Sequence, residues 1–514
     1  MASSEPFRFD LSRQAGAAPA AAQVADSFRW SWPNLYLTLP TLYANSTLRC
    51  RSPVVFRIMN TLGIALNRFG LGVRLGERGP ADTQRWLLSQ FDIYEPLPPA
   101  WRPLQGTAGL AEVWLAQQRA VRQAPESERS GIREAYLRQG RDDYVAAVGA
   151  RANSALRTSV PFVERLVHFW SNHFAVSVDK LLVVGLAGVF ERDAIRPHVL
   201  GRFEDMLLSV VRHPAMLLYL DQAQSMGPGS PAGRRARPDV GQQRRRGLNE
   251  NLAREIMELH TLGVRGGYSQ EDVTEFARAL TGWTLPSDER AGNSPGTFRF
   301  VSALHEPGVR VVRGRNYADS GEQQARDILH DLCIAPATAR HIAHKLARQF
   351  VADDPPPAMV QRLADTFERT GGDLPSLYGE LVASPEAWQP AQTKFKTPWE
   401  WAISSLRALG RQEMTPVQTT NLMNQLGQPV WRPGSPAGFD DVAATWAAPD
   451  ALLRRVEAAQ HLAMQSVDAI DARALAPHVL PDALGETTAN AIARAESGPT
   501  ALALLLVSPE FMRR

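Results

Sequence analysis

Apolar residues recur at spacings of three and four along most of the chain, which is the pattern of amphipathic helices. The clearest helical pair lies in residues 248–284, where the first helix runs through Leu262 and a glycine-rich turn begins at Gly263. Ser269 starts the second helix, and Asp272 completes the sequence of a capping box. The pattern predicts a helix-turn-helix pair around which we expect the rest of the chain to be arranged.

Four polar residues share one stripe of the first helix in this pair. At 100° per residue, Asn251, Arg254, Glu255 and Glu258 fall within a sector about 100° wide. The other side is mainly apolar, so we expect the helix to be buried and the stripe to be enclosed by protein. Enclosed charges predict either an ion-pair network, with Arg254 and Glu258 at i, i+4, or a polar pocket for acid–base or ligand-binding chemistry. The sequence leaves both interpretations open.

Two histidines lie on apolar helix faces. His173 belongs to a helix predicted over residues 160–176, and His260 to the first helix of the pair. Such histidines are more often core residues than ligands, although two opposed faces would bring the rings together, and a carboxylate would complete a transition-metal site. Glu258 lies about 200° around the helix from His260, and neither HExxH nor ExxH spacing occurs there. No metal ligand is therefore assigned.

Two further stretches stand out from the regular helical pattern. Glu164, His168 and Asn172 share a polar face of the same helix that carries His173. The irregular segment GQPVWRPGSPAGFDDVAATW, residues 427–446, is rich in Trp, Gly and Pro. It predicts either a packed wall of a pocket or an ordinary long loop.

Residues 227–247 predict a solvated loop, because they are rich in Gly, Pro and Arg and hold little that could be buried. Arg244 and Arg245 stand beside the central helix pair and are candidates for binding an anionic substrate or a polyanion. Aromatic residues for base stacking are missing from this segment, and a lid over the helix pair is a further hypothesis.

The helical pattern is interrupted between the central pair and the C-terminal third. The short runs TFRFV and VRVVRG flank His305 and predict a small β-hairpin near residues 297–314. A loop histidine beside the core has fewer structural duties than one inside a helix, so His305 joins the candidate site.

Composition narrows the classes of function. The 514 residues include 56 Lys and Arg against 53 Asp and Glu, a net charge of +3, which is no global nucleic-acid footprint. Cys50 and Cys333 support neither a disulfide framework nor a thiolate zinc site. No run of 18 apolar residues and no apolar leader segment occur, so we expect no membrane span and a cytoplasmic location. Dinucleotide turns, phosphate loops and nucleophile elbows are missing as well, and the cofactor stays unknown.

The expected architecture is all-α, as a large multi-helix bundle or as two packed helical lobes, with the small β-hairpin. An irregular extension is expected over residues 1–58, with Met59 as an alternative start of translation. A helical lobe follows over 59–284, a loop and hairpin insert over 285–320, and a second helical lobe over 321–514.

Several long motifs resemble one bacterial family. They are FWSNHF (169–174), IRPHVLGRFEDMLLSVVRHPAMLLYLD (195–221), NENLAREIMELHTLGVRGGYSQEDVTEFARALTGW (249–283) and SPEFMRR (508–514). Together they are similar to the bacterial domain-of-unknown-function family numbered eighteen hundred, over about residues 64–514. The resemblance implies a mostly helical protein and brings no established reaction.

Two positions depart from the pattern of that family. Gln222 stands where an Asn usually follows the residue matching Asp221, which weakens any role carried over to that position. Glu306 follows His305 where the family usually has an Asp.

The resemblance also implies a possible partner. Members of the family often look like exported proteins, and their genes often lie beside that of a twin-arginine-exported protein of family fifteen hundred and one. Co-export with such a partner to the periplasm is the alternative to a cytoplasmic location.

Three functional hypotheses follow. The leading one is an enzyme or enzyme component whose pocket joins the stripe to His305, with His173 and His260 nearby. Glu255 or Glu258 would be the acid or base, Arg254 would stabilise charge, and Asn251 would contact the substrate. The second is a non-catalytic scaffold or partner subunit in which the same residues form a structural network. The third is polyanion binding through the arginine-rich loop.

Overall fold

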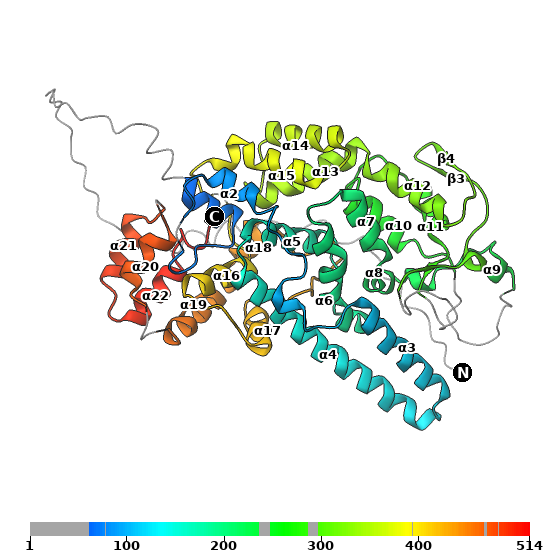
Figure 1. Cartoon of the computed structure of the whole chain (residues 1–514), viewed down its shortest axis with the longest axis horizontal. Coiled ribbons are helices and arrows are strands. Elements are labelled where there is room, and N and C mark those ends of the chain that lie inside the picture. The colour runs from blue at the N-terminus through cyan, green and yellow to red at the C-terminus, as the bar shows by residue number, and fades with distance from the viewer. Residues whose placement is uncertain are drawn as a thin grey trace, which may run out of the picture. The chain divides into compact units, whose positions relative to one another are not determined.

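Helices make up most of the computed structural model (Figure 1). It describes residues 61–77, 79–235, 247–285, 297–392, 394–466, 470–481 and 483–514. Within these ranges the strands form two antiparallel two-stranded sheets, which confirms an all-α protein with a small hairpin. The described residues belong to one unit, Ser52–Arg514, while the extension expected over residues 1–58 lies outside them. The division into two helical lobes stays a prediction.

Proline at the first helical position opens many of these helices, because its missing N–H would have no partner there and its fixed φ suits a helix. The helices before the strands are α2 (Thr83–Ser89), α3 (Thr107–Gln123), α4 (Glu126–Arg157), α5 (Pro161–His173), α6 (Ala187–Phe190), α7 (Phe203–Arg212), α8 (Pro214–Tyr219), α9 (Pro231–Arg235), α10 (Asn251–Glu255) and α11 (Gln270–Leu280). The helices after the strands are α12 (Glu322–Cys333), α13 (Pro336–Phe350), α14 (Pro357–Thr370), α15 (Leu374–Ala383), α16 (Pro398–Ala408), α17 (Pro416–Gln425), α18 (Ala443–Trp446), α19 (Pro449–Met464), α20 (Ala472–Val479), α21 (Glu486–Ala493) and α22 (Gly498–Leu506).

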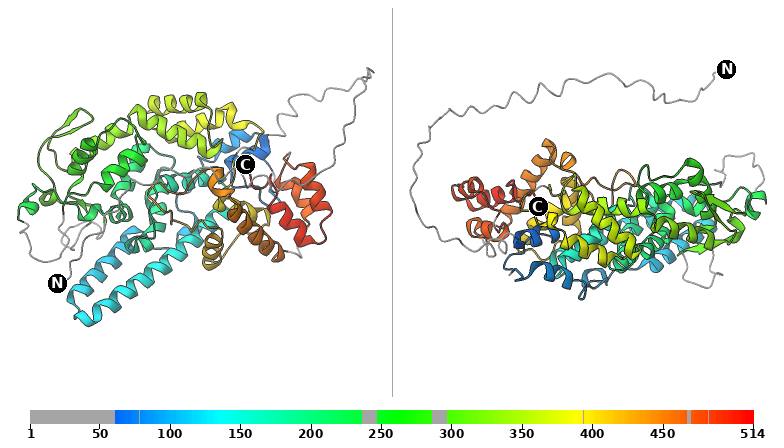
Figure 2. Two further views of the ribbon diagram at one scale, coloured as in Figure 1. Left: turned by 180° about the vertical axis from the view of Figure 1, so that it is seen from behind. Right: turned by 90° about the horizontal axis from the view of Figure 1, so that it is seen from above.

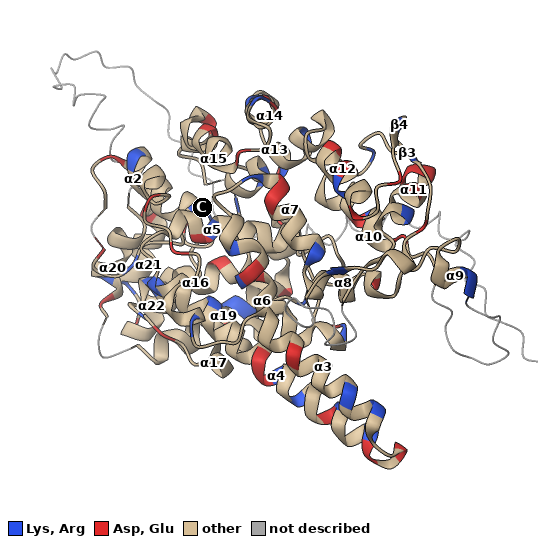
Figure 3. Ribbon diagram, turned by 45° about the vertical axis from the view of Figure 1, so that its right-hand side comes forward, with Lys and Arg blue, Asp and Glu red and all other residues tan. Residues whose placement is uncertain are grey.

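Helix α4 has two different halves. Its N-terminal half packs on α3 in a hairpin that extends away from the neighbouring helices (Figures 1 and 2). Acidic and basic residues alternate along this hairpin, as Figure 3 shows, which suits a solvated arm. From Ala147 onward most residues of α4 are buried, Arg151 among them. A helix that begins in solvent thus carries a charged side chain into the core.

Helix α5 lies in the core and is buried on almost every side. The ring of Phe162 packs against those of Phe69 and Phe350, each at a centroid distance of 5.7 Å. Trp170 stacks on Phe174 at 5.7 Å. Apolar contacts of this kind hold together segments that are far apart in the sequence.

The predicted helix pair is present as α10 and α11. A π-helical turn, Ile256–His260, continues α10, and Gly263 with a φ of +83° follows it. Ser269 and Asp272 form the expected capping box, with both reciprocal hydrogen bonds in place.

The two sheets differ from the predicted pairing. Strand β1 (Trp283–Thr284) pairs with β2 (Arg299–Phe300), and β3 (Arg310–Val312) pairs with β4 (Arg315–Tyr317). TFRFV and VRVVRG therefore do not pair with each other. The reason is the tight turn at Arg313 and Gly314, whose φ angles of 50° and 76° match the two-residue turns that reverse a strand directly.

Candidate functional site

Four buried charged residues form one ionic network, called the Glu191 network below. The Glu164 carboxylate accepts hydrogen bonds from both terminal nitrogens of Arg196, with Oε2 3.1 Å from Nη1. Glu191 lies 3.6 Å from Arg196 and 2.8 Å from Nε of Arg151. Two guanidinium groups and two carboxylates thus balance each other inside the core, as burial of charge requires.

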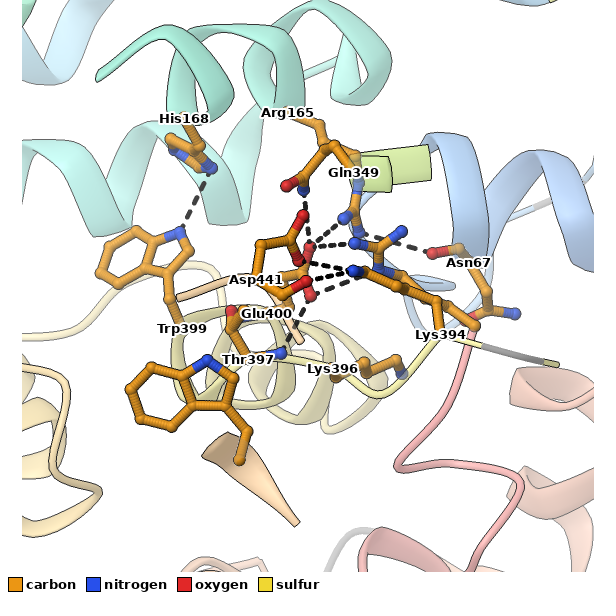
Figure 4. Close-up of polar contacts among 12 residues, drawn as sticks. Asn67, Arg165, His168, Gln349, Lys394, Lys396, Thr397, Trp399, Glu400 and Asp441 are labelled. Carbon is orange, nitrogen blue, oxygen red and sulfur yellow. Dashed lines mark hydrogen bonds and ion pairs between the residues drawn. The ribbon is translucent and has the colours of Figure 1, made fainter. Parts of the chain in front are cut away.

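A second network, the Glu400 network, surrounds one carboxylate of α16 (Figure 4). Glu400 accepts a hydrogen bond from Arg165 of α5 and one of 3.2 Å from Gln349 of α13, and it lies 2.9 Å from Arg514. It also caps its own helix by accepting from the backbone N–H of Thr397 at 3.0 Å. Burial acts to raise the pKa of Glu400, but Arg514 and Arg165 hold that pKa well below its usual value.

Asp441 belongs to the Glu400 network and has the opposite electrostatic character. It lies 3.0 Å from Nζ of Lys394, which also pairs with Asp353 at 2.7 Å. Burial raises the pKa of Asp441 to about 6, although Lys394 acts to lower it. The chain therefore holds a permanently ionised carboxylate, Glu400, beside one that titrates near neutrality.

The two networks meet at a cavity of about 80 Å³. Arg151 of the Glu191 network and Arg165, Glu400 and Asp441 of the Glu400 network all line it. Such a volume holds a few water molecules or one small ligand.

His168 of α5 also lines the cavity. Its Nδ1 accepts a hydrogen bond of 3.2 Å from the indole N–H of Trp399, and its Nε2 lies 3.6 Å from Glu164. Since an indole nitrogen only donates, the neutral ring carries its proton on Nε2. Burial and then the charge of Arg151 lower the pKa of His168, so the ring is neutral at pH 7.

A loop between α17 and α18 closes one side of the cavity. Asn172 donates to the carbonyl of Phe439 at 2.9 Å and accepts from its N–H at 2.8 Å. Gly438, at a φ of +85°, packs so tightly that a Cβ there would lie 2.3 Å from the Asn172 carbonyl oxygen. The indole N–H of Trp431 lies 3.2 Å from Glu191. Of the two alternatives predicted for residues 427–446, the structure supports the pocket wall, because residues between 428 and 441 line the cavity.

The predicted polar stripe of α10 lies elsewhere. Asn251 is exposed, and Arg254, Glu255 and Glu258 are half-buried. Arg254 pairs with Glu250 at 3.1 Å and not with Glu258. The expectation that the stripe is enclosed is wrong, because only the apolar side of this short amphipathic helix faces the core. A catalytic role for these residues stays a prediction.

His305 makes its polar contacts with residues outside the stripe. It is buried, its Nδ1 lies 3.0 Å from the Thr281 carbonyl oxygen, and its Nε2 lies 3.9 Å from Asp319. These contacts tie the loop before β3 to the end of α11. Arg244 and Arg245 lie outside the described residues, and Arg234 and Arg235 end α9 in the segment predicted to be a loop.

His173 and His260 do meet, with ring centroids 6.1 Å apart, and His341 lies equally far from His173. Among the described residues, no carboxylate completes the set. Instead, burial and then the charge of Lys345 lower the pKa of both His173 and His260. In the part of the chain that the structure describes, no group of three or more His, Cys, Asp or Glu could hold a metal ion.

These features define a class: a helical protein with paired charges around a small cavity at its core. The chain belongs to the family described as protein of unknown function (DUF1800), whose model matches residues 64–513. No curated protein and no solved structure matches the chain. None of the described helices has both the length and the apolar character needed to cross a bilayer.

Replacing Glu400 tests how much its network contributes to the free energy of unfolding. Glu400→Gln leaves two buried guanidinium groups without their shared anion, so we expect the free energy of unfolding to fall by about 3–5 kcal/mol at pH 7. Because the folded-state pKa of Glu400 is lowered, its stabilisation is present above the unfolded pKa of about 4.3 and is lost as the pH falls further. Urea unfolding at pH 7 and below pH 4 measures both effects.

The matched control is Glu457→Gln, since Glu457 is exposed on α19. This change should leave the unfolding midpoint unaltered. Equal midpoints for the Glu400 variant and wild type at pH 7 would contradict the network.

Lys396 offers a second test through pH. It is 1% exposed, and burial followed by Arg165 lowers its pKa to about 7. In the unfolded chain this amine has a pKa of about 10.4, so between pH 7 and 10 the unfolded state binds a proton that the folded state has largely lost. The free energy of unfolding of the wild type therefore rises with pH across this range. Lys396→Met removes that dependence, and we expect a higher melting temperature than wild type at pH 7 and a shrinking gap toward pH 10. A gap of constant size across this range would contradict the assignment.

Proposed function

We propose that the cavity is an active site for acid–base chemistry on a small polar ligand, so that the protein is an enzyme or an enzyme component. The observation that carries the proposal is the pair of cavity-lining carboxylates, Glu400 and Asp441, whose pKa values are shifted in opposite directions. Two such groups with separated pKa values are the usual arrangement for dividing roles between a fixed charge and a proton donor or acceptor.

Each residue has a proposed role that follows from its contacts. Asp441, with a pKa of about 6, is the proton donor or acceptor. Glu400 stays ionised and fixes Arg165. His168 is neutral and is held in place by Trp399 and Glu164. A neutral imidazole is better suited to hydrogen bonding with a ligand than to stabilising an anion through charge.

The rival proposal is a non-catalytic scaffold or partner subunit, in which both networks serve stability alone. The projecting hairpin of α3 and α4 favours it, because a charged arm offers surface to another protein (Figure 3). An exported partner would place the complex in the periplasm, whereas the chain alone would act in the cytoplasm. Polyanion binding through residues 227–247 is a third proposal, recognisable by its steep dependence on salt.

The variant Asp441→Asn distinguishes the enzyme proposal from the scaffold proposal. The variant keeps the shape of the side chain but cannot titrate, so we expect it to lose at least 10²-fold of the turnover. Purified wild type and variant are incubated with a small-molecule extract, and untargeted mass spectrometry records the compounds that wild type alone consumes. Glu457→Gln is the control and should behave as wild type.

The same variant reports on stability. Because the folded-state pKa of Asp441 is raised, wild type loses stability as the pH rises from about 4 to 6, and the asparagine variant does not. We therefore expect no loss of melting temperature at pH 7.5. A loss of several kcal/mol together with unchanged small-molecule profiles would favour the scaffold.

A further inference from the structure

Arg151 is a buried guanidinium with unused hydrogen-bond donors. The residue is 8% exposed, and its Nε lies 2.8 Å from Glu191. Neither terminal nitrogen donates a hydrogen bond to any residue that the structure describes. Since buried charged donors normally have acceptors, this group lacks a partner on the side where it lines the cavity.

The surroundings hold this guanidinium in one orientation. Its central carbon lies 4.4 Å from the ring centroid of Trp399 and 5.6 Å from that of Trp431. Both indoles stabilise the cation through their ring faces, and Glu191 fixes the Nε side. The N–H groups of the terminal nitrogens lie in the guanidinium plane, so they are pre-oriented for a planar acceptor with two oxygens.

We propose that this site binds a small monocarboxylate, held by a two-point contact between its carboxylate and Arg151. The proposal deepens the acid–base function above and rests on it for the view that the bound acid is a substrate. A carboxylate matches the planar fork of arginine in shape and charge.

The other residues of the cavity favour one negative charge over two. Glu400 and Asp441 line the same cavity and would repel a phosphate dianion more strongly than a monoanion. The side-chain oxygen of Gln428 accepts from the backbone N–H of Trp399 at 2.8 Å, while the side-chain nitrogen of Gln428 has no partner among the described residues and can donate to a ligand.

The volume of the cavity and its apolar lining determine what the ligand can carry beside its carboxylate. Phe169, Val430 and Phe439 contribute apolar wall, and about 80 Å³ leaves room for only a short chain. The ligand class is therefore a carboxylic acid with a body of a few carbon atoms.

Propionate is the probe, with propionamide as its neutral isostere and inorganic phosphate as the competing anion. Thermal unfolding at pH 7.5 and constant ionic strength is followed against the concentration of each. A ligand that binds only the folded state raises the melting temperature in a saturable way. We expect saturation with propionate and no saturable shift with propionamide or phosphate.

Arg151→Lys keeps the charge but loses the fork, and we expect at least tenfold weaker binding of propionate. Arg157→Lys, on the same helix but half-exposed and paired with Glu413, is the matched control and should bind as wild type. Gln428→Glu, which adds a negative charge to the cavity wall, should abolish binding and keeps the test decisive if the Arg151 variant does not fold.

Equal affinity of wild type and Arg151→Lys, tighter binding of phosphate, or no saturation with propionate would each overturn the proposal. Its failure is separable from that of the acid–base function. If propionate does not bind but Asp441→Asn still abolishes turnover of another compound, only the ligand class is wrong. If propionate binds and Asp441→Asn turns over as wild type, the anion site stands without the proposed acid.

Discussion

The structure depends on one constraint, the need to neutralise charge that has been removed from water. Glu400 obtains its two guanidinium partners from Arg165 and Arg514, which are 235 and 114 residues away in sequence. An unpaired carboxylate or guanidinium buried in the core would cost several kcal/mol of folding free energy. The three segments that carry these residues must therefore pack together. The C-terminal residues are therefore part of the core and not an appendage to it.

The cavity follows from the same constraint. Polar side chains of α5 face three ways: Glu164 toward Arg196, Arg165 toward Glu400, and Asn172 toward the backbone of Phe439. The loop between α17 and α18 is held in place by hydrogen bonds to its backbone. It therefore fills the space between the two networks less completely than freely packing apolar side chains would. The terminal nitrogens of Arg151, which line the space that remains, donate to no residue that the structure describes, and Asp441, paired with Lys394, is the carboxylate there whose pKa is raised.

The sequence predicts secondary structure better than it predicts the site, for physical reasons. Caps and terminators are local, so the capping box of Ser269 and Asp272 could be predicted in full. Helical periodicity gives the angle between side chains but not how deeply each side is buried. It therefore predicts an enclosed polar stripe in the first helix of the pair, whereas Asn251 is exposed and the other three residues are half-buried. Periodicity also predicts the face of Glu164, His168 and Asn172, but its partners Arg196, Trp399 and Phe439 are fixed only by tertiary packing. Adjacent residues Glu164 and Arg165 even belong to different networks, which no sequence pattern indicates.

The proposed anchor and the proposed acid are linked by charge balance. Arg151 and Arg196 already balance Glu164 and Glu191, so a bound carboxylate would add a negative charge that the Glu191 network does not compensate. Asp441 lines the same cavity and is the carboxylate there whose pKa is raised toward neutrality. A nearby anion raises the pKa of a carboxyl group further, so binding of the acid would favour the protonated form of Asp441. The ligand would then meet a neutral carboxylic acid able to donate a proton, which makes anion binding by Arg151 the step that prepares Asp441 for its role.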